Sequence, residues 1–243
     1  MDSGGGISQA FIEEHMGEYQ AAYDLLEDSF SKDCFAAYLN CRNNEDYRFL
    51  LPCSRERVSY FHNPFYDVTD HEAYLDVGAY DGDTIREFVE AAGGNYQKII
   101  AIEPEPDSYQ KLERYVVSSQ LSNVDLYKNG CWDRTGTLYF VRDQESSRIG
   151  DEGDALPVQR LDEQFWDEAV TLVKINFLSG VVETLKGATE ILQNRRPKLA
   201  ITVGFDEWGI IRIPQTIQEI NPDYRFGLRY ASPMPARLIL FCY

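Results

Sequence analysis

The spacing of apolar side chains along the chain changes near Ala73. Before it, from Ser8 to about Asn43, apolar residues recur at steps of three and four, which is the spacing of amphipathic helices. Two helices are the simplest interpretation of this segment. The stretch that follows, to Asp70, is rich in Pro, Asn and aromatic residues and keeps no single period, so we interpret it as an ordered linker.

From Ala73 onward, short apolar runs alternate with helical stretches. The predicted strands are Ala73–Val77, Ile99–Ile102, Val124–Tyr127, Thr137–Phe140, Leu172–Ile175, Leu199–Val203 and Leu238–Tyr243. The predicted helices between them are Thr84–Ala92, Ser108–Gln120, Val182–Gln193 and Pro214–Glu219. This alternation is typical of an α/β fold in which a mostly parallel sheet carries helices on both faces.

The length of 243 residues favours one large domain with an appendage over two full domains. We therefore expect a helical N-terminal extension and linker over residues 1–68 and one α/β domain over residues 69–243. No apolar run approaches the length of a membrane span, which is about 20 residues. Residues 1–6 also lack the basic and apolar regions of a signal peptide.

Charge and cysteine content narrow the range of partners. The 40 acidic residues against 23 basic ones give a net charge of −17, which repels nucleic-acid phosphates and anionic membranes. We therefore expect neither a nucleic acid nor a membrane as a partner. The five cysteines show no spacing typical of a zinc site or a disulfide framework, so reduced thiols and a cytoplasmic location are expected.

The segment Tyr74–Thr84 reads as a buried strand, a glycine-rich turn and the start of a helix. In open α/β sheets a ligand binds at the carboxyl end of such a strand, where glycines let the backbone approach it, although a tight turn without a ligand has the same pattern. Glu103 favours a ligand, because a carboxylate at the tip of the second strand can accept both hydroxyl protons of a ribose. Gly78 and Gly82 form a Gly-x-x-x-Gly turn, which departs from the dinucleotide pattern and disfavours a dinucleotide.

Further segments extend this picture along the chain. They are Asp76–Asp83, Ile102–Pro104, Asn129–Asp133, Val158–Asp162, Glu183–Ala188 and Asn221–Tyr224. On these segments the chain resembles the FkbM-type methyltransferases, which use S-adenosylmethionine (SAM) and typically O-methylate sugars and natural products. The resemblance reaches the C-terminal strand and, more loosely, extends back to about Leu25. It implies an α/β, Rossmann-like SAM-dependent methyltransferase fold with a seven-stranded, mostly parallel sheet whose final strand is antiparallel.

The resemblance also implies which residues hold the cofactor. The Gly78–Gly82 turn is expected to hold the methionine part of SAM, Glu103 the ribose, and the Asn129–Trp132 turn the adenine. The expected cofactor-binding residues are Asp76, Gly78, Ala79, Tyr80, Gly82, Asp83, Glu103, Pro104, Cys131 and Trp132. Trp132 can equally be a core aromatic. Cys131 is expected to pack rather than react, because its neighbours supply no basic group.

The sequence departs from the family pattern at two places. Where the family usually has Lys-x-Asp-x-Glu-Gly after a strand, the segment Lys174–Ser179 carries Asn176 and Leu178 at the acidic positions. Neither side chain can take a proton, and with so few carboxylates we expect no metal site there. At Gly204-Phe205, where relatives often have a histidine, none is present.

The catalytic candidates are Lys174, Asn176 and His62. Lys174 can stabilise an acceptor anion, and Asn176 can orient the acceptor through its amide. His62 is a candidate substitute base because an imidazole is neutral near pH 7, although an ordinary surface or packed histidine is the favoured interpretation of a single residue. Asp206 and Glu207 are further candidates, although a solvated acidic loop is the favoured interpretation of these two residues.

Two functions stay open on these grounds. The first is a SAM-dependent methyltransferase that acts on a hydroxyl of a sugar or a natural-product-like small molecule. The second is a SAM-binding protein of the same fold that has lost or changed the methylation chemistry, which Asn176 and Leu178 favour. In the first case the partner is a small-molecule acceptor.

Overall fold

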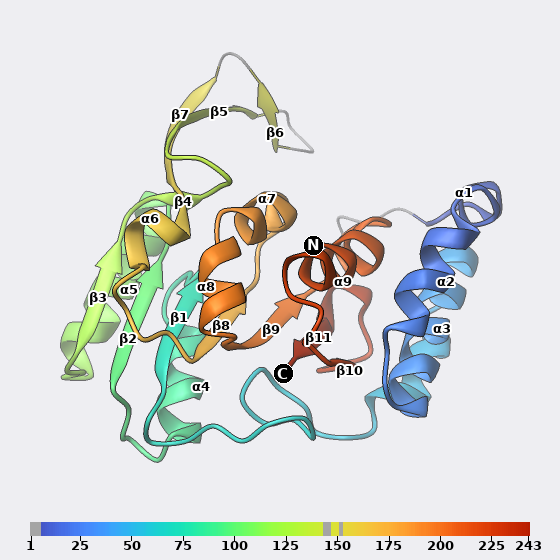
Figure 1. Cartoon of the computed structure of the whole chain (residues 1–243), viewed down its shortest axis with the longest axis horizontal. Helices are drawn as coiled ribbons and strands as arrows, with labels where there is room; N and C mark the ends of the chain where they lie inside the picture. Colours follow the sequence, from blue (N-terminus) through green and yellow to red (C-terminus); the bar gives the residue numbers. More distant parts are fainter. Residues whose placement is uncertain (1–5, 143–146, 151–152) are drawn as a thin grey trace. The chain divides into compact units, whose positions relative to one another are not determined.

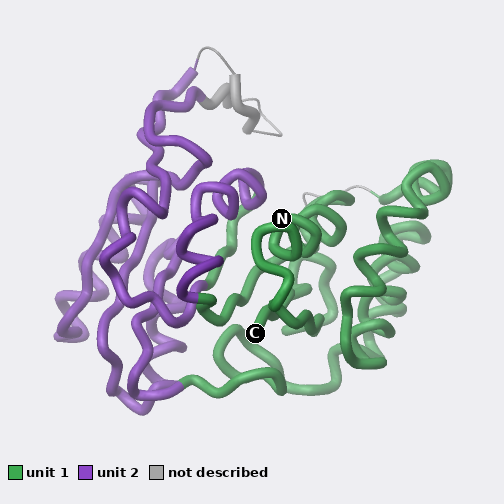
Figure 2. The backbone as a smooth tube through the Cα atoms, in the orientation of Figure 1, with its two compact units in different colours: residues 1–68, 174–178, 196–243 green, residues 69–173, 179–195 purple. Residues whose placement is uncertain are grey.

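The structure is a computed structural model that describes residues 6–142, 147–150 and 153–243. Residues 1–5 lie outside the described residues. They make up most of the segment 1–6, for which the sequence shows no signal-peptide pattern. The chain forms two compact units, shown by colour in Figure 2. Unit 1 comprises residues 1–68, 174–178 and 196–243, and unit 2 comprises residues 69–173 and 179–195. The division into domains 1–68 and 69–243 stays a prediction.

The larger sheet has seven strands within the described residues, in the order β10-β11-β9-β8-β1-β2-β3 (Figure 1). In chain order these strands are β1 Ala73–Val77, β2 Lys98–Ile102, β3 Val124–Tyr127, β8 Leu172–Ile175, β9 Lys198–Thr202, β10 Phe226–Tyr230 and β11 Leu238–Cys242. β1, β2 and β3 pair in parallel, whereas β11 runs antiparallel to both β9 and β10. The predicted α/β, Rossmann-like fold class, with its antiparallel final strand, is confirmed.

Two strands differ from the expectation. The run Thr137–Phe140 is part of β5 Gly136–Arg142, but β5 belongs to a second sheet in the described chain, with the order β4-β7-β5-β6. The other strands of that sheet are β4 Gly130–Cys131, β6 Ser147–Gly150 and β7 Asp154–Gln159. The seventh strand of the larger sheet is instead β10, which is buried throughout. Gly227 and Arg229 interrupt its apolar residues, so no apolar run predicts it.

The helices of unit 2 follow the predicted pattern with two exceptions: the short helix Leu161–Phe165 is not among the predicted helices, and one predicted helix is divided into two. The helices are α4 Asp83–Ala91, α5 Pro106–Ser118, α6 Leu161–Phe165, α7 Val181–Lys186 and α8 Thr189–Asn194. α4 buries Ile85 and Phe88 on one face, as its amphipathic pattern predicts. The single helix expected over Val182–Gln193 is two helices, because Gly187, a poor helix former, ends α7 before α8 begins.

Unit 1 contains the N-terminal helices and one side of the larger sheet. Its α-helices in the described residues are α1 Gln9–Glu14, α2 Met16–Asp24, α3 Ser29–Asn44 and α9 Gly209–Ile220, and its 3₁₀ helices are η1 Tyr47–Ser54 and η2 Pro235–Arg237. Three helices replace the two expected before residue 45. His15 leaves helical geometry between α1 and α2, and Asp28 caps α3 by accepting the Ser31 N–H at 2.9 Å.

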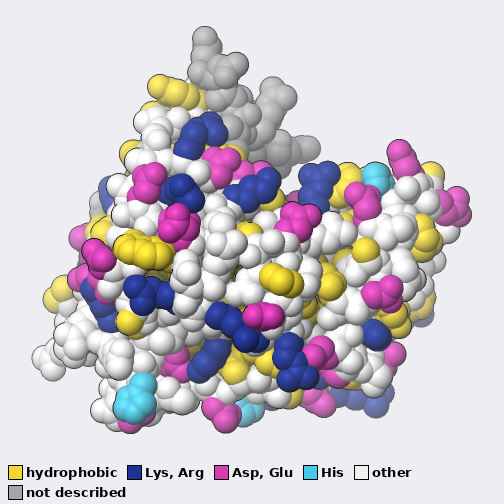
Figure 3. Space-filling model, viewed as in Figure 1, with side chains coloured by type: hydrophobic (Ala, Val, Ile, Leu, Met, Phe, Trp, Pro, Cys, Tyr) yellow, Lys and Arg dark blue, Asp and Glu magenta, His cyan; other side chains and the backbone are white. Residues whose placement is uncertain are grey.

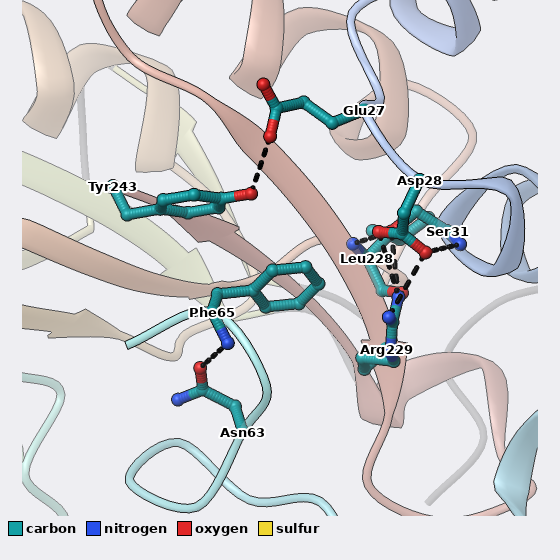
Figure 4. A network of polar contacts seen from close by, with 8 residues as sticks. All are labelled: Glu27, Asp28, Ser31, Asn63, Phe65, Leu228, Arg229 and Tyr243. Atoms are coloured by element: carbon teal, nitrogen blue, oxygen red, sulfur yellow. Dashed lines mark hydrogen bonds and ion pairs between the residues drawn. The ribbon is translucent and has the colours of Figure 1, made fainter. Parts of the chain in front are cut away.

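Arg229 of β10 connects the N-terminal helices and the linker within unit 1 (Figure 4). Its guanidinium lies 4.9 and 4.7 Å from the ring centroids of Phe30 and Phe65. It donates to the Asp28 carboxylate at 3.1 Å and to the Ser31 hydroxyl at 2.8 Å. Burial acts to raise the pKa of Asp28, but hydrogen bonds from Ser31 and Arg229 outweigh it and hold that pKa below its ordinary value. The N-terminal segment is thus anchored by a buried, paired charge.

Three further observations bear on surface and location. Acidic and basic side chains are interspersed on the face drawn in Figure 3. Among the described residues, no helix is long and apolar enough to cross a membrane. The five cysteines are all free thiols, and all are buried.

Candidate functional site

The turn between β1 and α4 depends on two glycines. Gly78 and Gly82 have φ values of 81° and 89°, in the left-handed region that favours glycine. A Cβ on Gly82 would lie only 2.5 Å from a ring carbon of Tyr115, so no side chain fits there. The N–H groups of Gly78 and Ala79 both donate to the Ile102 carbonyl at 3.0 Å, which fixes the turn to the end of β2.

Asp76 is a fully buried carboxylate at the end of β1. The Thr84 hydroxyl in the first turn of α4 donates to it at 2.6 Å, a short charge-assisted hydrogen bond across the glycine turn. Asp83 lies beside Thr84 and is exposed. The two ends of the turn are therefore joined by side chains as well as by backbone.

Glu103 follows β2, and its side chain is buried beside this turn. One carboxylate oxygen accepts the Tyr80 N–H at 2.8 Å, and the other accepts the Glu105 N–H at 2.8 Å. Two backbone donors therefore fix the orientation of the carboxylate. Tyr80 has a φ of 51°, which is strained for a residue with a Cβ, and its side chain is exposed. The strained turn directs a backbone N–H at Glu103. Pro104 is half-buried next to it.

The Asn129–Trp132 turn, which is expected to hold the adenine, contains β4. Trp132 donates its N–H to the Gln159 carbonyl at 3.1 Å, and its half-buried ring lies against Gly180. The adenine contact of this ring stays a prediction. Cys131 is buried, and burial raises the pKa of its thiol far above the ordinary value. The protonated thiol agrees with a packing role.

The predicted site residues divide between the two units. The ten expected cofactor residues all lie in unit 2, and the structure connects the β1 turn to Glu103 by hydrogen bonds. The three catalytic candidates, Lys174, Asn176 and His62, lie in unit 1. The roles of all thirteen residues stay predictions.

Lys174 is buried, with 1 % of its surface exposed. Its ammonium lies 5.9 Å from the ring centroid of Tyr60, within the range of a cation–π interaction. The Tyr60 hydroxyl forms a hydrogen bond of 2.8 Å with Thr202 on β9. His62 is the candidate base predicted from this linker, but its side chain is exposed, whereas Tyr60, two residues earlier, packs on Lys174. Only the aromatic content of the linker could have indicated Tyr60.

The altered acidic positions follow Lys174. Asn176 is half-buried, and Leu178 has 60 % of its surface exposed. An exposed leucine gains no burial energy from its position. Within residues 6–142, 147–150 and 153–243, no three His, Cys, Asp or Glu side chains are grouped so that they could hold a metal ion.

The loop after β9 is held by helices α2 and α3. The Tyr38 hydroxyl donates to the Asp206 carbonyl at 2.7 Å, and the Tyr19 hydroxyl donates to the Glu207 carbonyl at 3.2 Å. The Asp206 carboxylate accepts the backbone N–H groups of Trp208 and Gly209 at 2.9 and 2.7 Å, where α9 begins. Asp206 therefore forms an Asx-type turn that leads into α9, a structural role that its sequence position does not reveal.

The fold and the turn at β1 and β2 define a methyltransferase-type α/β domain. The profile of the methyltransferase FkbM domain matches residues 76–220. The chain belongs to the FkbM methyltransferase family.

The chain is also similar in structure to solved proteins, of which the first described here shows the same fold. The methyltransferase FkbM from Methylobacillus flagellatus KT superposes with a TM-score of 0.84 and 23 % identity, over 96 % of this chain and 60 % of that one. The present chain thus spans 60 % of the length of that relative. An rRNA methylase from Streptococcus thermophilus has a TM-score of 0.48 and 14 % identity, over 72 % of this chain and 87 % of that one. Aeropyrum pernix fibrillarin, with natively bound S-adenosyl-L-methionine, has a TM-score of 0.48 and 11 % identity, over 73 % and 69 %. No curated protein matches the chain in sequence.

Proposed function

We propose that this chain binds SAM at the β1–α4 turn and transfers its methyl group to a hydroxyl of a sugar or natural-product-like small molecule. The observation that carries the proposal is the buried carboxylate of Glu103, oriented by the Tyr80 and Glu105 N–H groups beside the Gly78–Gly82 turn. Membership of the FkbM methyltransferase family supports the same activity.

The residues of this turn fit the cofactor. Gly78, with a φ of 81° and no side chain, allows a ligand to approach the backbone closely. Each oxygen of the Glu103 carboxylate has two acceptor positions, so a ribose hydroxyl can donate to it in addition to a backbone N–H. When bound, SAM supplies an electrophilic methyl group on a sulfonium.

The acceptor side works without a carboxylate in this proposal. Methyl transfer depends strongly on alignment of the reacting atoms, and Asn176 can orient an acceptor through its amide. A general base typically contributes about 10²–10⁴-fold, which neither Asn176 nor Leu178 can supply. Lys174, a buried ammonium, can instead stabilise negative charge that develops on the acceptor oxygen.

A second function is favoured by Leu178. An apolar, 60 % exposed side chain at a position that is usually acidic is consistent with a chain that binds SAM but has lost or changed the transfer chemistry. The cofactor half is the same in both proposals. They differ only in whether a methyl group leaves SAM.

Calorimetry with S-adenosylhomocysteine (SAH) and SAM tests the cofactor site. Loss of a charged acceptor costs about 1.5–3 kcal/mol, so Glu103→Ala should weaken binding about tenfold or more. Glu113→Ala, which removes an exposed carboxylate from α5, is the matched control and should bind as the wild type does. A Glu103→Gln variant keeps the size of the side chain and removes its charge. Weaker binding by this variant too would show that the loss in Glu103→Ala does not come from misfolding. Absence of binding in the wild type would refute the cofactor assignment.

Transfer of a tritiated methyl group to candidate sugars and hydroxylated small molecules separates the two functions. The first function predicts both binding and transfer. The second predicts binding with no transfer to any hydroxyl acceptor.

A further inference from the structure

Trp132 contacts both ends of α7. At the start of the helix, Gly180 has a φ of 95°, and a Cβ there would lie 2.5 Å from ring atom Cζ3 of Trp132. At the end of the helix, a Cβ on Gly187 would lie 2.1 Å from the Trp132 carbonyl oxygen. Real Cβ atoms do not approach other atoms so closely, so only glycine allows α7 to lie against Trp132 at both ends.

The middle of α7 is attached to the preceding residue. Thr184 is fully buried and donates its hydroxyl proton to the Cys131 carbonyl at 3.1 Å. The two residues Cys131 and Trp132 therefore contact the beginning, the middle and the end of α7. The Trp132 N–H in turn donates to the Gln159 carbonyl, which fixes these two residues to the end of β7.

The attachment continues into α8 through Asp162. The Asp162 N–H donates to the Gly187 carbonyl at 2.9 Å, and its buried carboxylate accepts the Glu190 and Ile191 N–H groups at 3.0 Å. These bonds satisfy donors at the start of α8. The end of α7 is thus held on two sides, whereas its start is held by the packing of Gly180 on the Trp132 ring.

We propose that Trp132 is a positioning residue that couples cofactor binding to the placement of α7 and of the chain that enters it from Asn176. The inference rests on the proposed function, because it takes the Asn129–Trp132 turn as the adenine side of the cofactor site. A ligand that contacts the ring when the ring lies on Gly180 binds that arrangement more tightly and increases its population. Such coupling needs a tightly packed contact that a bound ligand can favour, and the close approach of Gly180 to the Trp132 ring is such a contact.

The coupling orders the two halves of the reaction. Asn176, which we propose orients the acceptor, lies four residues before Gly180. Cofactor binding would fix Gly180 and thereby limit the conformations of the segment that carries Asn176. Affinity for the acceptor would then depend on whether the cofactor is bound. By linkage, affinity for the cofactor would depend equally on whether the acceptor is bound.

Hydrogen exchange measured by mass spectrometry, with and without saturating SAH, tests the proposal. In the wild type, SAH should slow exchange both at the Gly78–Gly82 turn and in α7. In Trp132→Leu, exchange of α7 without ligand should rise about tenfold, and SAH should slow exchange at the turn only. The control is Trp166→Leu, which removes a 43 % exposed ring elsewhere in unit 2 and should behave as the wild type does.

A second variant separates loss of the ring from loss of its packing on α7. Gly180→Ala keeps the Trp132 ring but displaces it, and should give the same faster exchange in α7 while Asp162-linked amides at the start of α8 stay protected. Equal α7 exchange in the wild type and in Trp132→Leu would overturn the proposal, as would equal SAH protection of α7 in both. If SAH protects the Gly78–Gly82 turn of the wild type but not α7, the coupling is overturned and the proposed function is not. No protection of the wild-type turn would overturn the proposed function together with the coupling.

Discussion

The turns that follow β1 and β8 share a backbone design. Each leads into a helix through a glycine in the left-handed region, Gly82 with a φ of 89° before α4 and Gly180 with a φ of 95° before α7. In each case an aromatic ring occupies the place of the missing side chain. A Cβ would lie 2.5 Å from Tyr115 at the first glycine and 2.5 Å from Trp132 at the second. Close packing of an aromatic ring therefore determines both turns.

The polar groups at the two turns differ. The β1 turn has the buried carboxylate of Asp76 and is hydrogen-bonded to that of Glu103. The segment after β8 has a half-buried Asn176 and an exposed Leu178 where the family usually has acids. In this chain, Gly180 and its packing on the Trp132 ring shape the turn, and no carboxylate is part of the Lys174–Ser179 segment. The shape of a turn therefore does not by itself indicate its chemistry.

The largest expected effect concerns the shared glycines. Gly82→Ala and Gly180→Ala should each lower the free energy of unfolding by roughly 2–5 kcal/mol, since left-handed strain adds to overpacking against a ring. Urea unfolding followed by tryptophan fluorescence measures this, because Trp132 and Trp166 both lie in unit 2. A loss at only one of the two positions would break the proposed equivalence of the turns.

Two other glycines separate strain from overpacking. Gly93 has a φ of 62°, but no atom lies within 4 Å of the place that a Cβ would occupy, so Gly93→Ala should cost only the strain, about 1–2 kcal/mol. Gly17 lies in α2, has equally open space around it and needs no positive φ. Gly17→Ala should therefore stabilise the chain by roughly 0.5–1 kcal/mol. The same urea unfolding measures both variants, and a loss at Gly93 as large as that at Gly82 would assign the whole effect to strain.

The next effect compares a threonine near each glycine. Thr84 donates to the Asp76 carboxylate, whereas Thr184 donates to the Cys131 carbonyl. Because hydrogen bonds to charged groups contribute more, Thr84→Val should cost roughly 1.5–3 kcal/mol and Thr184→Val about 0.5–1.5 kcal/mol. Urea titrations again measure both variants. Equal losses would mean that the buried carboxylate adds no stability to the β1 turn.

Local patterns predict most of the sheet, and the exceptions have physical causes. Strands with runs of apolar residues, such as β11 and Ile99–Ile102 of β2, are visible in the sequence because both of their faces are buried. β10 is hidden because Arg229, buried between two rings and paired with Asp28, occupies a core position that an apolar pattern cannot mark. Such a pair joins residues 201 positions apart.

The candidate site shows the same limit. The link between the β1 turn and Glu103 is predictable, since carboxyl ends of adjacent parallel strands meet at one edge. The contact of Tyr60 with Lys174 and the turn that Asp206 forms before α9 depend on the folded arrangement. The sequence therefore predicts the polar groups of the cofactor turn better than the surroundings of the catalytic candidates.

The smallest expected change, in SAH affinity, belongs to a variant that tests the chemical difference between the turns. Asn176→Asp places one acid after β8 without changing side-chain size. The Glu103 carboxylate, which we propose binds the ribose, belongs to the other turn and is unchanged. SAH affinity should therefore change by no more than about twofold, which is roughly 0.4 kcal/mol. If the chain transfers methyl groups, turnover should rise, at most about 10²-fold, because the new carboxylate can take the proton of a hydroxyl acceptor. Calorimetry and tritiated methyl transfer on the same preparations measure the two quantities, with Asn176→Ala as the variant that removes the amide without adding an acid.

Since the Lys174–Ser179 segment of the wild type has no carboxylate, the transfer activity of the wild type should also persist in excess chelator. Loss of transfer in chelator, with recovery on addition of magnesium or manganese, would show that the turn after β8 works with a metal despite the absence of these acids.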